Sequence, residues 1–484
     1  MIFGADLFSA PGALYYQLPA CALVAMSVVW LCRWIWRRDR TMGVMVQIGL
    51  ALRLWAGLLL FGISYLKLPI LQELYLGDGF WELAPDARSY YWGATLAAEE
   101  GLRTVADWSP SPAFVKVLAL WMRMLGTSPA SAVLLNVCSY VGIATLLVAG
   151  FGCDQSRTAR KAVLLSLFAF TFSPALLVFG TQALKDQFFA LLLVGTCCAA
   201  WIGFRALPPS GAPRTFWQEA VAVLGAAGCI YLMAGIRAYV AFLSILVAAV
   251  VLVASASRRT LKQAPAYLTV CAVIVALFWV SFKGGAGAYY GYYEAALLST
   301  VGITRTGPIG SAADSVLAAR EGFVQSGGAT NVIFRVKRVE GAGWLRRTWE
   351  YTLQMGLGTL VILVPISLLR WTSIVQFDGG RGLLTITDLD TMFIGVTLVA
   401  VVLLLKRAWK PPRANLEYLA FAASLCVLLT GLMAFVVTNY GSLFRLRVIV
   451  ASLMWLLPLA LVRPDGDGRQ STADLGAIVP AEHR

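Results

Sequence analysis

A series of long apolar segments, separated by short polar stretches, constrains the fold of this chain more than any other feature. A helix needs roughly 20 apolar residues to cross a hydrocarbon core about 30 Å thick. The 484-residue chain offers about eleven such segments, and only 13% of its residues are charged, whereas soluble domains have roughly 25%. The sequence therefore predicts an all-α polytopic membrane protein of about eleven transmembrane helices.

We expect these spans at eleven positions along the chain. The stretch 218–257 would be about 60 Å long as one helix at 1.5 Å per residue, so a turn is expected at AGIRAY, residues 234–239. The expected spans are 15–34, 44–66, 128–150, 162–182, 187–204, 218–235, 238–256, 264–282, 391–409, 415–438 and 444–462.

Four basic clusters predict the orientation of these helices. Lys and Arg gather in cytoplasmic loops, which places the N-terminus outside and the C-terminus inside. Two long loops, 67–127 and 283–349, then lie on the outer face, together with the short corners at 183–186, 236–238 and 439–443. The clusters are RWIWRRDR (33–40), RTARK (157–161), RRTLK (258–262) and KRAWKPPR (406–413).

The remaining segments complete a domain plan with one integral membrane domain over residues 1–462. Segment 111–126 has apolar residues at helical spacing but is short for a span, so we expect an interfacial helix there. Segment 350–370 is expected to be re-entrant or tilted. Residues 463–484 form a polar cytoplasmic tail.

Composition excludes several kinds of site. The one histidine, His483, lies in the polar tail, and none of the nine cysteines has the spacing of a metal site. Histidine-dependent catalysis is therefore not expected. The net charge of +14 suits cytoplasmic loops and phosphorylated lipids, and no nucleic-acid partner is expected because no basic stripe is interleaved with exposed aromatic residues.

The polar residues of the predicted outer face form a candidate site. Guanidinium and ammonium groups that face one cavity suit a phosphate or diphosphate. A nearby carboxylate could act as a general base toward an attacking hydroxyl, and Tyr90 could stack on a sugar ring. The candidates are Asp86 or Asp186 as the base and, for substrate binding, Arg88, Tyr90, Lys185, Asp186, Arg237, Tyr239, Arg445 and Arg447.

A second acidic pair leaves a divalent metal as the one cofactor that the sequence keeps open. Asp388 and Asp390, in TDLDT, have the Asp-x-Asp spacing of oxygen ligands for such ions. The same pattern is common before helices, where the carboxylates act as caps.

Three sequence stretches resemble those of the GT-C membrane glycosyltransferases, which include protein O-mannosyltransferases and the aminoarabinose transferase of lipid A. SPSPAFVKVLALWMRMLGTSPASAVLLNVCSY (109–140) is similar to their interfacial helix, Leu-Gly turn and next span. FSPALLVFGTQALKDQFFALLLV (172–194) and NYGSLFRLRVIVASLMWLLPLAL (439–461) resemble segments of bacterial members from polysaccharide clusters.

The resemblance implies an inverting transferase in the bacterial cytoplasmic (inner) membrane. Its donor would be a polyprenyl-phosphate-linked sugar, and its acceptor would be a lipid, glycan or protein on the outer face. The protein would be in contact with membrane lipids. Asp86 would match the general base, Lys185 and Asp186 the second-corner pair, and Arg445 and Arg447 the basic residues near the lipid phosphate. The first loop has Asp86-Ala-Arg88 where the mannosyltransferases have tandem acidic residues.

Three other functions stay open at this point. A polymerase of lipid-linked polysaccharide repeats also combines about eleven spans with arginines that grip diphosphates. A lipid or glycan transporter (flippase) would show repeated halves and helices broken at the midplane, and the sequence has no such symmetry. A non-catalytic partner in an export complex is the third.

Overall fold

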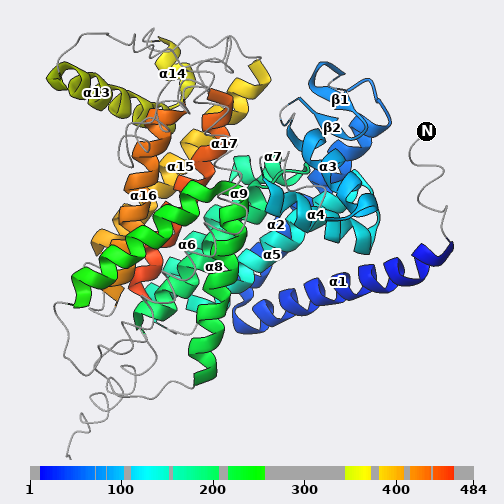
Figure 1. Cartoon of the computed structure of the whole chain (residues 1–484), viewed down its shortest axis with the longest axis horizontal. Helices are drawn as coiled ribbons and strands as arrows, with labels where there is room; N and C mark the ends of the chain where they lie inside the picture. Colours follow the sequence, from blue (N-terminus) through cyan, green and yellow to red (C-terminus); the bar gives the residue numbers. More distant parts are fainter. Residues whose placement is uncertain are drawn as a thin grey trace, which may run out of the picture.

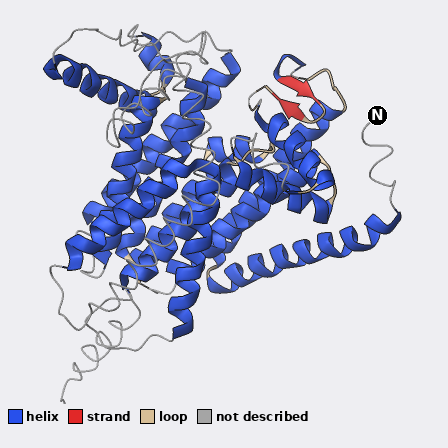
Figure 2. Cartoon of the chain, in the orientation of Figure 1, coloured by secondary structure: helices blue, strands red, loops and turns tan. Residues whose placement is uncertain are grey.

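The computed structural model describes residues 11–70, 72–82, 84, 86–102, 111–151, 156–205, 216–256, 344–371, 381–407, 415–437 and 440–462. Within these residues the chain is almost entirely helical (Figure 2). The first half contains α1 (Pro11–Arg38), α2 (Arg40–Tyr65), β1 (Tyr75–Gly77), β2 (Phe80–Trp81), α3 (Asp86–Glu100), α4 (Pro112–Leu125), α5 (Pro129–Phe151), α6 (Arg157–Phe172), α7 (Pro174–Gly180), α8 (Asp186–Arg205) and α9 (Phe216–Ala256). The second half contains α13 (Trp344–Leu363), α14 (Ile366–Trp371), α15 (Arg381–Arg407), α16 (Leu416–Val436) and α17 (Tyr440–Leu456), and short 3-10 helices lie at Gln72–Leu74 and Leu457–Leu461.

Eight of the described helices are long and apolar enough to cross a membrane, or nine if the bent pair α6–α7 counts as one span. An all-α polytopic membrane protein is therefore confirmed, while the exact number of spans stays a prediction. The expected span at 264–282 lies outside the described residues, as do most of the loop 283–349 and the tail 463–484. The candidate spans lie in α1, α2, α5, α8, α9, α15, α16 and α17.

Helix α9 is broken where the length argument requires a turn. Its 41 residues are interrupted at Arg237, whose backbone (φ −148°, ψ 79°) is extended, and Figure 1 shows two arms on either side of a bend. The break lies inside the predicted corner 234–239. Gly235 packs against Ala113 so closely that a Cβ on the glycine would overlap it, and this contact ties the break to the start of α4.

The segment expected as one span at 162–182 is instead bent by 50° between α6 and α7. Ser173 (φ −56°, ψ 119°) separates the two helices and caps α7, since its hydroxyl accepts a hydrogen bond from Leu176 N. Pro174 explains the bend, because a proline disfavours helical geometry in the residue before it and has no N–H to continue the ladder.

The described residues of the first long loop form a small hairpin and two helices beside the bundle. Strands β1 and β2 pair antiparallel through a turn in which Asp78 has φ 55°. Helix α4 occupies the segment expected as an interfacial helix. Its apolar face (Phe114, Val115, Leu118, Ala119 and Met122) is buried, and it contacts α1, α3, α5 and α9.

The segment expected to be re-entrant or tilted, 350–370, forms most of α13 and α14. Neither is among the candidate spans. Helix α13 packs against α16 and lies across the end of the bundle in Figure 1. How deep α13 and α14 lie in a membrane stays a prediction.

Candidate functional site

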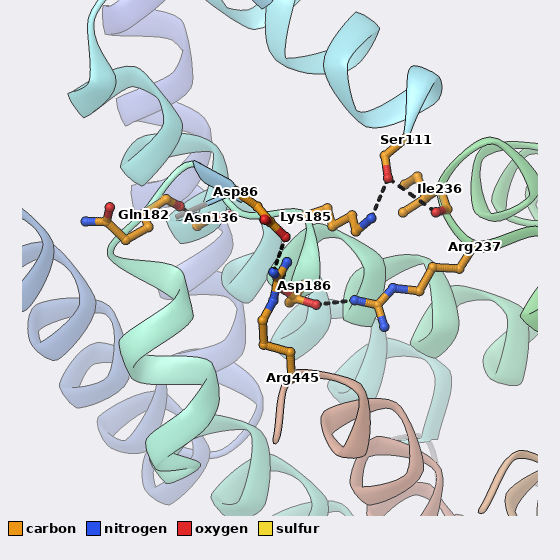
Figure 3. Close-up of polar contacts among 9 residues, drawn as sticks. All are labelled: Asp86, Ser111, Asn136, Gln182, Lys185, Asp186, Ile236, Arg237 and Arg445. Atoms are coloured by element: carbon orange, nitrogen blue, oxygen red, sulfur yellow. Dashed lines mark hydrogen bonds and ion pairs between the residues drawn. The ribbon is translucent and has the colours of Figure 1, made fainter. Parts of the chain in front are cut away.

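Five charged side chains from four separate segments meet at one end of the helix bundle (Figure 3). One comes from the start of α3, two from the corner before α8, one from the break in α9 and one from α17. We call them the open cluster: Asp86, Lys185, Asp186, Arg237 and Arg445. The topology of the predicted outer corners therefore does bring these five predicted residues together.

Asp186 lies at the centre of the open cluster, and each of its carboxylate oxygens accepts from a different arginine. Arg237 Nη2 lies 2.5 Å from Oδ1 and Arg445 Nη2 lies 3.3 Å from Oδ2. The Asp186 side chain is only 3% exposed. A buried carboxylate is tolerated when it is paired and hydrogen-bonded, so Asp186 is held as an anion that fixes the two guanidinium groups.

Asp86 sits in a different environment at the first residue of α3. Its Oδ2 accepts from Arg445 Nη1 at 2.5 Å, and its side chain is 53% exposed, against 15% for Arg445. Arg445 thus bridges a buried carboxylate and an exposed one. The exposed carboxylate is the group that a molecule from outside can reach.

Lys185 is partly buried between the arginines and an aromatic ring. Its Nζ donates to Ser111 Oγ at 2.5 Å and lies 5.2 Å from the centre of the Tyr90 ring. Burial first, and then the neighbouring charges of Arg237 and Arg445, lower the pKa of Lys185 to about 7, although Asp186 and Asp86 act in the opposite direction. An incoming anion would therefore favour the ammonium form of Lys185.

Ser111 is a site residue that sequence reasoning missed. Its hydroxyl accepts from Lys185 and donates to the carbonyl of Ile236 at 3.4 Å, so it joins α4, the corner before α8 and the break in α9. Serine occurs in most loops and carries little signal alone. Its position directly before Pro112, at the N-terminus of α4, was the available clue.

The corner that carries Lys185 and Asp186 is shaped by buried amides. Asn136 of α5 donates to the carbonyls of Gly180 (3.2 Å) and Gln182 (2.6 Å), and so satisfies groups that the end of α7 leaves open. Gln182 in turn donates to Gly79 O at 3.4 Å. The corner is thereby fixed to α5 and to the hairpin of the first loop.

Three buried nitrogens of the open cluster have no hydrogen-bond partner among the described residues. They are Arg237 Nε, Arg237 Nη1 and Arg445 Nε. Buried polar groups are nearly always hydrogen-bonded, and an exception calls for an explanation. An anionic ligand could accept hydrogen bonds from these spare donors on two arginines, next to a partly buried lysine.

The other predicted site residues around the open cluster are arranged as follows. Tyr90 is buried and packs edge-on against Phe114, 5.5 Å between ring centres, and burial raises its pKa. Tyr239 is half-buried beside Arg237 and Asp186. Arg88 points elsewhere, since its Nη2 lies 4.0 Å from Asp78 Oδ2 and both side chains are exposed.

Arg447, predicted as a substrate ligand, belongs to a separate set of contacts in the bundle interior. It donates from Nε to Asp390 Oδ2 (3.0 Å), from Nη1 to Thr391 Oγ1 (2.5 Å) and from Nη2 to Thr387 O (2.7 Å), and its Nη2 lies 2.8 Å from Asp390 Oδ2 in an ion pair. Its side chain is 1% exposed. Each of its nitrogens is engaged, so Arg447 lies apart from the open cluster, and its role in substrate binding stays a prediction.

Asp390 and Arg53 stabilise the two sides of the α6–α7 bend. Asp390 Oδ1 accepts from Ala175 N at 3.0 Å at the start of α7. Arg53 donates to the carbonyls of Phe170 (2.8 Å) and Thr171 (3.0 Å) at the end of α6. An anion at a helix N-terminus and a cation at a C-terminus both oppose the helix dipole. We call Arg53, Asp390 and Arg447 the closed cluster.

Arg53 is held by acceptors other than a carboxylate in its described contacts. These contacts are with backbone carbonyls and with the Tyr140 ring, 3.9 Å from the guanidinium carbon. Carbonyl groups that the bend leaves open at the end of α6 therefore bind the buried guanidinium group.

The weak metal candidates Asp388 and Asp390 have unrelated surroundings. Asp388 accepts from the backbone N–H and hydroxyl of Ser367 and from Ile366 N (2.7 Å), at the start of α14. Asp390 faces Arg447. Both carboxylates thus cap the N-termini of helices other than the one that carries them. The described residues contain no group of three or more His, Cys, Asp or Glu suited to a metal ion.

Two of the basic clusters, 33–40 and 157–161, lie at the ends of α2 and α6 that are away from the open cluster. Asp39, between α1 and α2, pairs with Arg160 of α6 at 2.5 Å, and the chain then runs the length of α2 before it reaches the first loop. The Arg160 hydrogen bond is the main reason why the pKa of Asp39 is lowered.

Comparisons of the chain with models of known families, with curated proteins and with solved structures find no match. The function is therefore inferred from the geometry of the open cluster.

Proposed function

We propose that the protein is a membrane glycosyltransferase that takes a sugar from a polyprenyl-phosphate donor and transfers it to a lipid, glycan or protein acceptor. The observation that carries the proposal is the meeting of Asp86, Lys185, Asp186, Arg237 and Arg445 at one end of the bundle. Such a site combines anion-binding groups with an exposed carboxylate, the two components that this reaction needs.

The charge of the open cluster favours a donor with a single phosphate. Three cations and two carboxylates leave one positive charge when Lys185 is protonated. A polyprenyl-phosphate sugar is a phosphodiester with one negative charge, so donor and site together are neutral. A diphosphate-linked donor would leave a surplus negative charge in a half-buried site, where such a surplus is costly.

The same balance holds as the reaction proceeds. A bond forms between the acceptor oxygen and the anomeric carbon, the bond from that carbon to the phosphate oxygen breaks, and its electron pair leaves with the phosphate. The acceptor proton passes to Asp86. The released polyprenyl phosphate then has about two negative charges, and the cluster, with Asp86 protonated, has two positive ones.

Asp86 is better suited than Asp186 to the role of base. Both oxygens of Asp186 are held by arginines and its side chain is buried. Asp86 has one oxygen in such a contact and is half exposed, so an acceptor hydroxyl can approach it. Tyr90, whose ring lies beside Lys185, lines the same region.

The distribution of charge supports transfer on the outer face of the bacterial inner membrane. The pair Asp39–Arg160 and the basic ends of α1 and α15 lie away from the open cluster along the bundle. Because Lys and Arg collect on the cytoplasmic side, the open cluster would face outward.

The proposal is tested by the surface glycan of a deletion strain of the source organism, complemented with wild type, Asp86→Asn or Asp78→Asn. We expect Asp86→Asn to lower glycan by about 100-fold or more, as for loss of a general base, at an unchanged membrane level. Asp78→Asn removes the same charge from the same loop but lies outside the cluster, and should support normal glycan. Normal glycan with Asp86→Asn would rule out Asp86 as the base.

A further inference from the structure

Arg445 has two carboxylate partners that differ in how firmly they are held. Asp186 is 3% exposed, and Arg237 holds its other oxygen at 2.5 Å. Asp86 is 53% exposed, and the hydrogen bond that the described contacts give its side chain comes from Arg445. Exposed ion pairs contribute little to stability, while buried hydrogen-bonded ones are costly to break. Asp86 is therefore the partner that Arg445 can release.

An incoming phosphate needs the part of Arg445 that Asp86 now occupies. Arginine binds phosphate most strongly through two neighbouring nitrogens. In Arg445, Nε is unpaired, whereas Nη1 and Nη2 are engaged by Asp86 and Asp186. A fork-like contact with phosphate therefore displaces one carboxylate, and the exposed one yields more easily.

We propose that Asp86 and the donor phosphate compete for the guanidinium group of Arg445, so that binding of the donor itself releases the Asp86 carboxylate to act as a base. The inference rests on the proposed function and adds a positioning role for Arg445. In the empty protein the ion pair engages one oxygen of this exposed carboxylate, so that oxygen is not available to an acceptor hydroxyl. With the donor bound, the carboxylate is free beside the sugar that will be transferred.

The competition can be measured as the affinity of purified protein in lipid nanodiscs for polyprenyl phosphate. Asp86→Asn removes the competing charge, so we expect the dissociation constant to fall roughly twofold to fivefold, in line with the strength of an exposed ion pair. Arg445→Gln should raise it about tenfold or more. In the double variant Asp86→Asn/Arg445→Gln, the gain from Asp86→Asn should disappear, since non-additivity of this kind measures the coupling of the two groups.

Asp78→Asn provides the matched control. Asp78 is an exposed carboxylate of the same loop that faces Arg88 rather than Arg445, and asparagine tolerates its positive φ of 55°. Its affinity for polyprenyl phosphate should equal that of the wild type. Asp86→Asn and Asp78→Asn should give the wild-type unfolding midpoint to within about 2 °C, because both remove exposed charges. Arg445→Gln leaves the buried Asp186 with one arginine, so the double variant is compared with Arg445→Gln, which carries the same change.

Two results would overturn the competition. The first is an unchanged or weakened affinity in Asp86→Asn. The second is the same gain from Asp86→Asn with and without Arg445, because the carboxylate would then act only through its general charge. Neither result depends on glycan synthesis. Tighter binding in Asp86→Asn together with normal surface glycan would contradict the role of Asp86 in the proposed function but would still support the competition for Arg445.

Discussion

The open and closed clusters contain the same residue types but differ in how those residues are paired and exposed. Both pair arginine with aspartate, and both include a residue of α17, Arg445 in one and Arg447 in the other. In the closed cluster each nitrogen of Arg447 is engaged and Asp390 is fully buried, although Arg53 Nε is buried and has no hydrogen-bond partner among the described residues. In the open cluster three buried guanidinium nitrogens lack partners and one carboxylate faces outward. Unsatisfied donors beside an exposed carboxylate, rather than charge alone, distinguish a binding site from a structural ion pair.

The closed cluster should give the largest effect when it is broken. Asp390→Leu leaves Arg447 buried without its anion and removes the cap of α7, so we expect a loss of about 3–5 kcal/mol in the free energy of unfolding. Unfolding of the purified protein in mild detergent with increasing SDS measures it.

A second substitution tests whether the loss of stability in Asp390→Leu comes from the unpaired charge of Arg447 or from altered packing. Asp390→Leu combined with Arg447→Met removes both charges and should recover most of the stability. If the double variant is as unstable as Asp390→Leu, the uncompensated charge is not the cause.

Packing around Arg53 gives the next effect. Gly49 lies on α2 where a Cβ would overlap the Tyr140 hydroxyl and lie 2.7 Å from Thr171 Cγ2. Gly49→Ala should therefore destabilise the protein by about 1–3 kcal/mol, the usual cost of overpacking, in the same SDS unfolding experiment. Gly62→Ala, on the same helix but with open space around its Cβ, is the control and should be neutral or slightly stabilising. Equal losses in the two variants would contradict tight packing at Gly49.

The open cluster should respond to pH through Lys185. The pKa of Lys185 is lowered to about 7, so the empty protein loses this charge as pH rises above 7. A bound phosphate favours the ammonium form, so binding takes up a proton. Affinity for polyprenyl phosphate should then fall between pH 7 and 9, by up to roughly tenfold per pH unit.

Lys185→Arg is the control for this pH dependence, because arginine stays charged over that range. Its affinity should be nearly constant between pH 7 and 9. Phosphate itself titrates near pH 6, below the range measured. The same slope in wild type and Lys185→Arg would assign the dependence to another group.

The smallest effect is expected at the exposed pair Asp39–Arg160. Asp39→Asn removes the charge but keeps a good N-cap for α2, so the unfolding midpoint at pH 7 should barely change. The contribution of the pair requires ionised Asp39, and since the pKa of Asp39 is lowered, it is present above the ordinary carboxyl range and lost as pH falls through the lowered pKa. A large loss of stability at pH 7 would mean that exposed pairs matter here as much as buried ones.

The fold and much of the site could be predicted because membrane helices leave clear signals. Apolar length predicted most of the candidate membrane helices in the described residues, although 162–182 is bent and 218–256 is one broken helix. The length of 218–257 predicted the break found at Arg237. Alternation of the spans then placed Asp86, Lys185, Arg237 and Arg445 on one side. The bend at Ser173 was missed because Pro174 lies inside an otherwise continuous apolar run.

The separation of Arg447 from the open cluster has a simple geometric reason. Each helical residue turns about 100°, so residues two apart face nearly opposite sides. Arg445 and Arg447 could not both point into one site from α17. The same reasoning applies to Asp388 and Asp390 in α15. The contacts of Arg53 could not be foreseen, since backbone carbonyls at a helix bend leave no mark in the sequence.

The most direct test of the account is an experimental structure of the protein with polyprenyl phosphate bound, in a lipid nanodisc. We expect the phosphate oxygens to lie within hydrogen-bond distance, about 2.7–3.2 Å, of Arg445 and Lys185, with Asp86 released from Arg445 and the Arg447–Asp390 pair unchanged. A phosphate bound at Arg447, or one bound away from Arg445 with the Asp86 pair intact, would contradict the division between an open and a closed cluster.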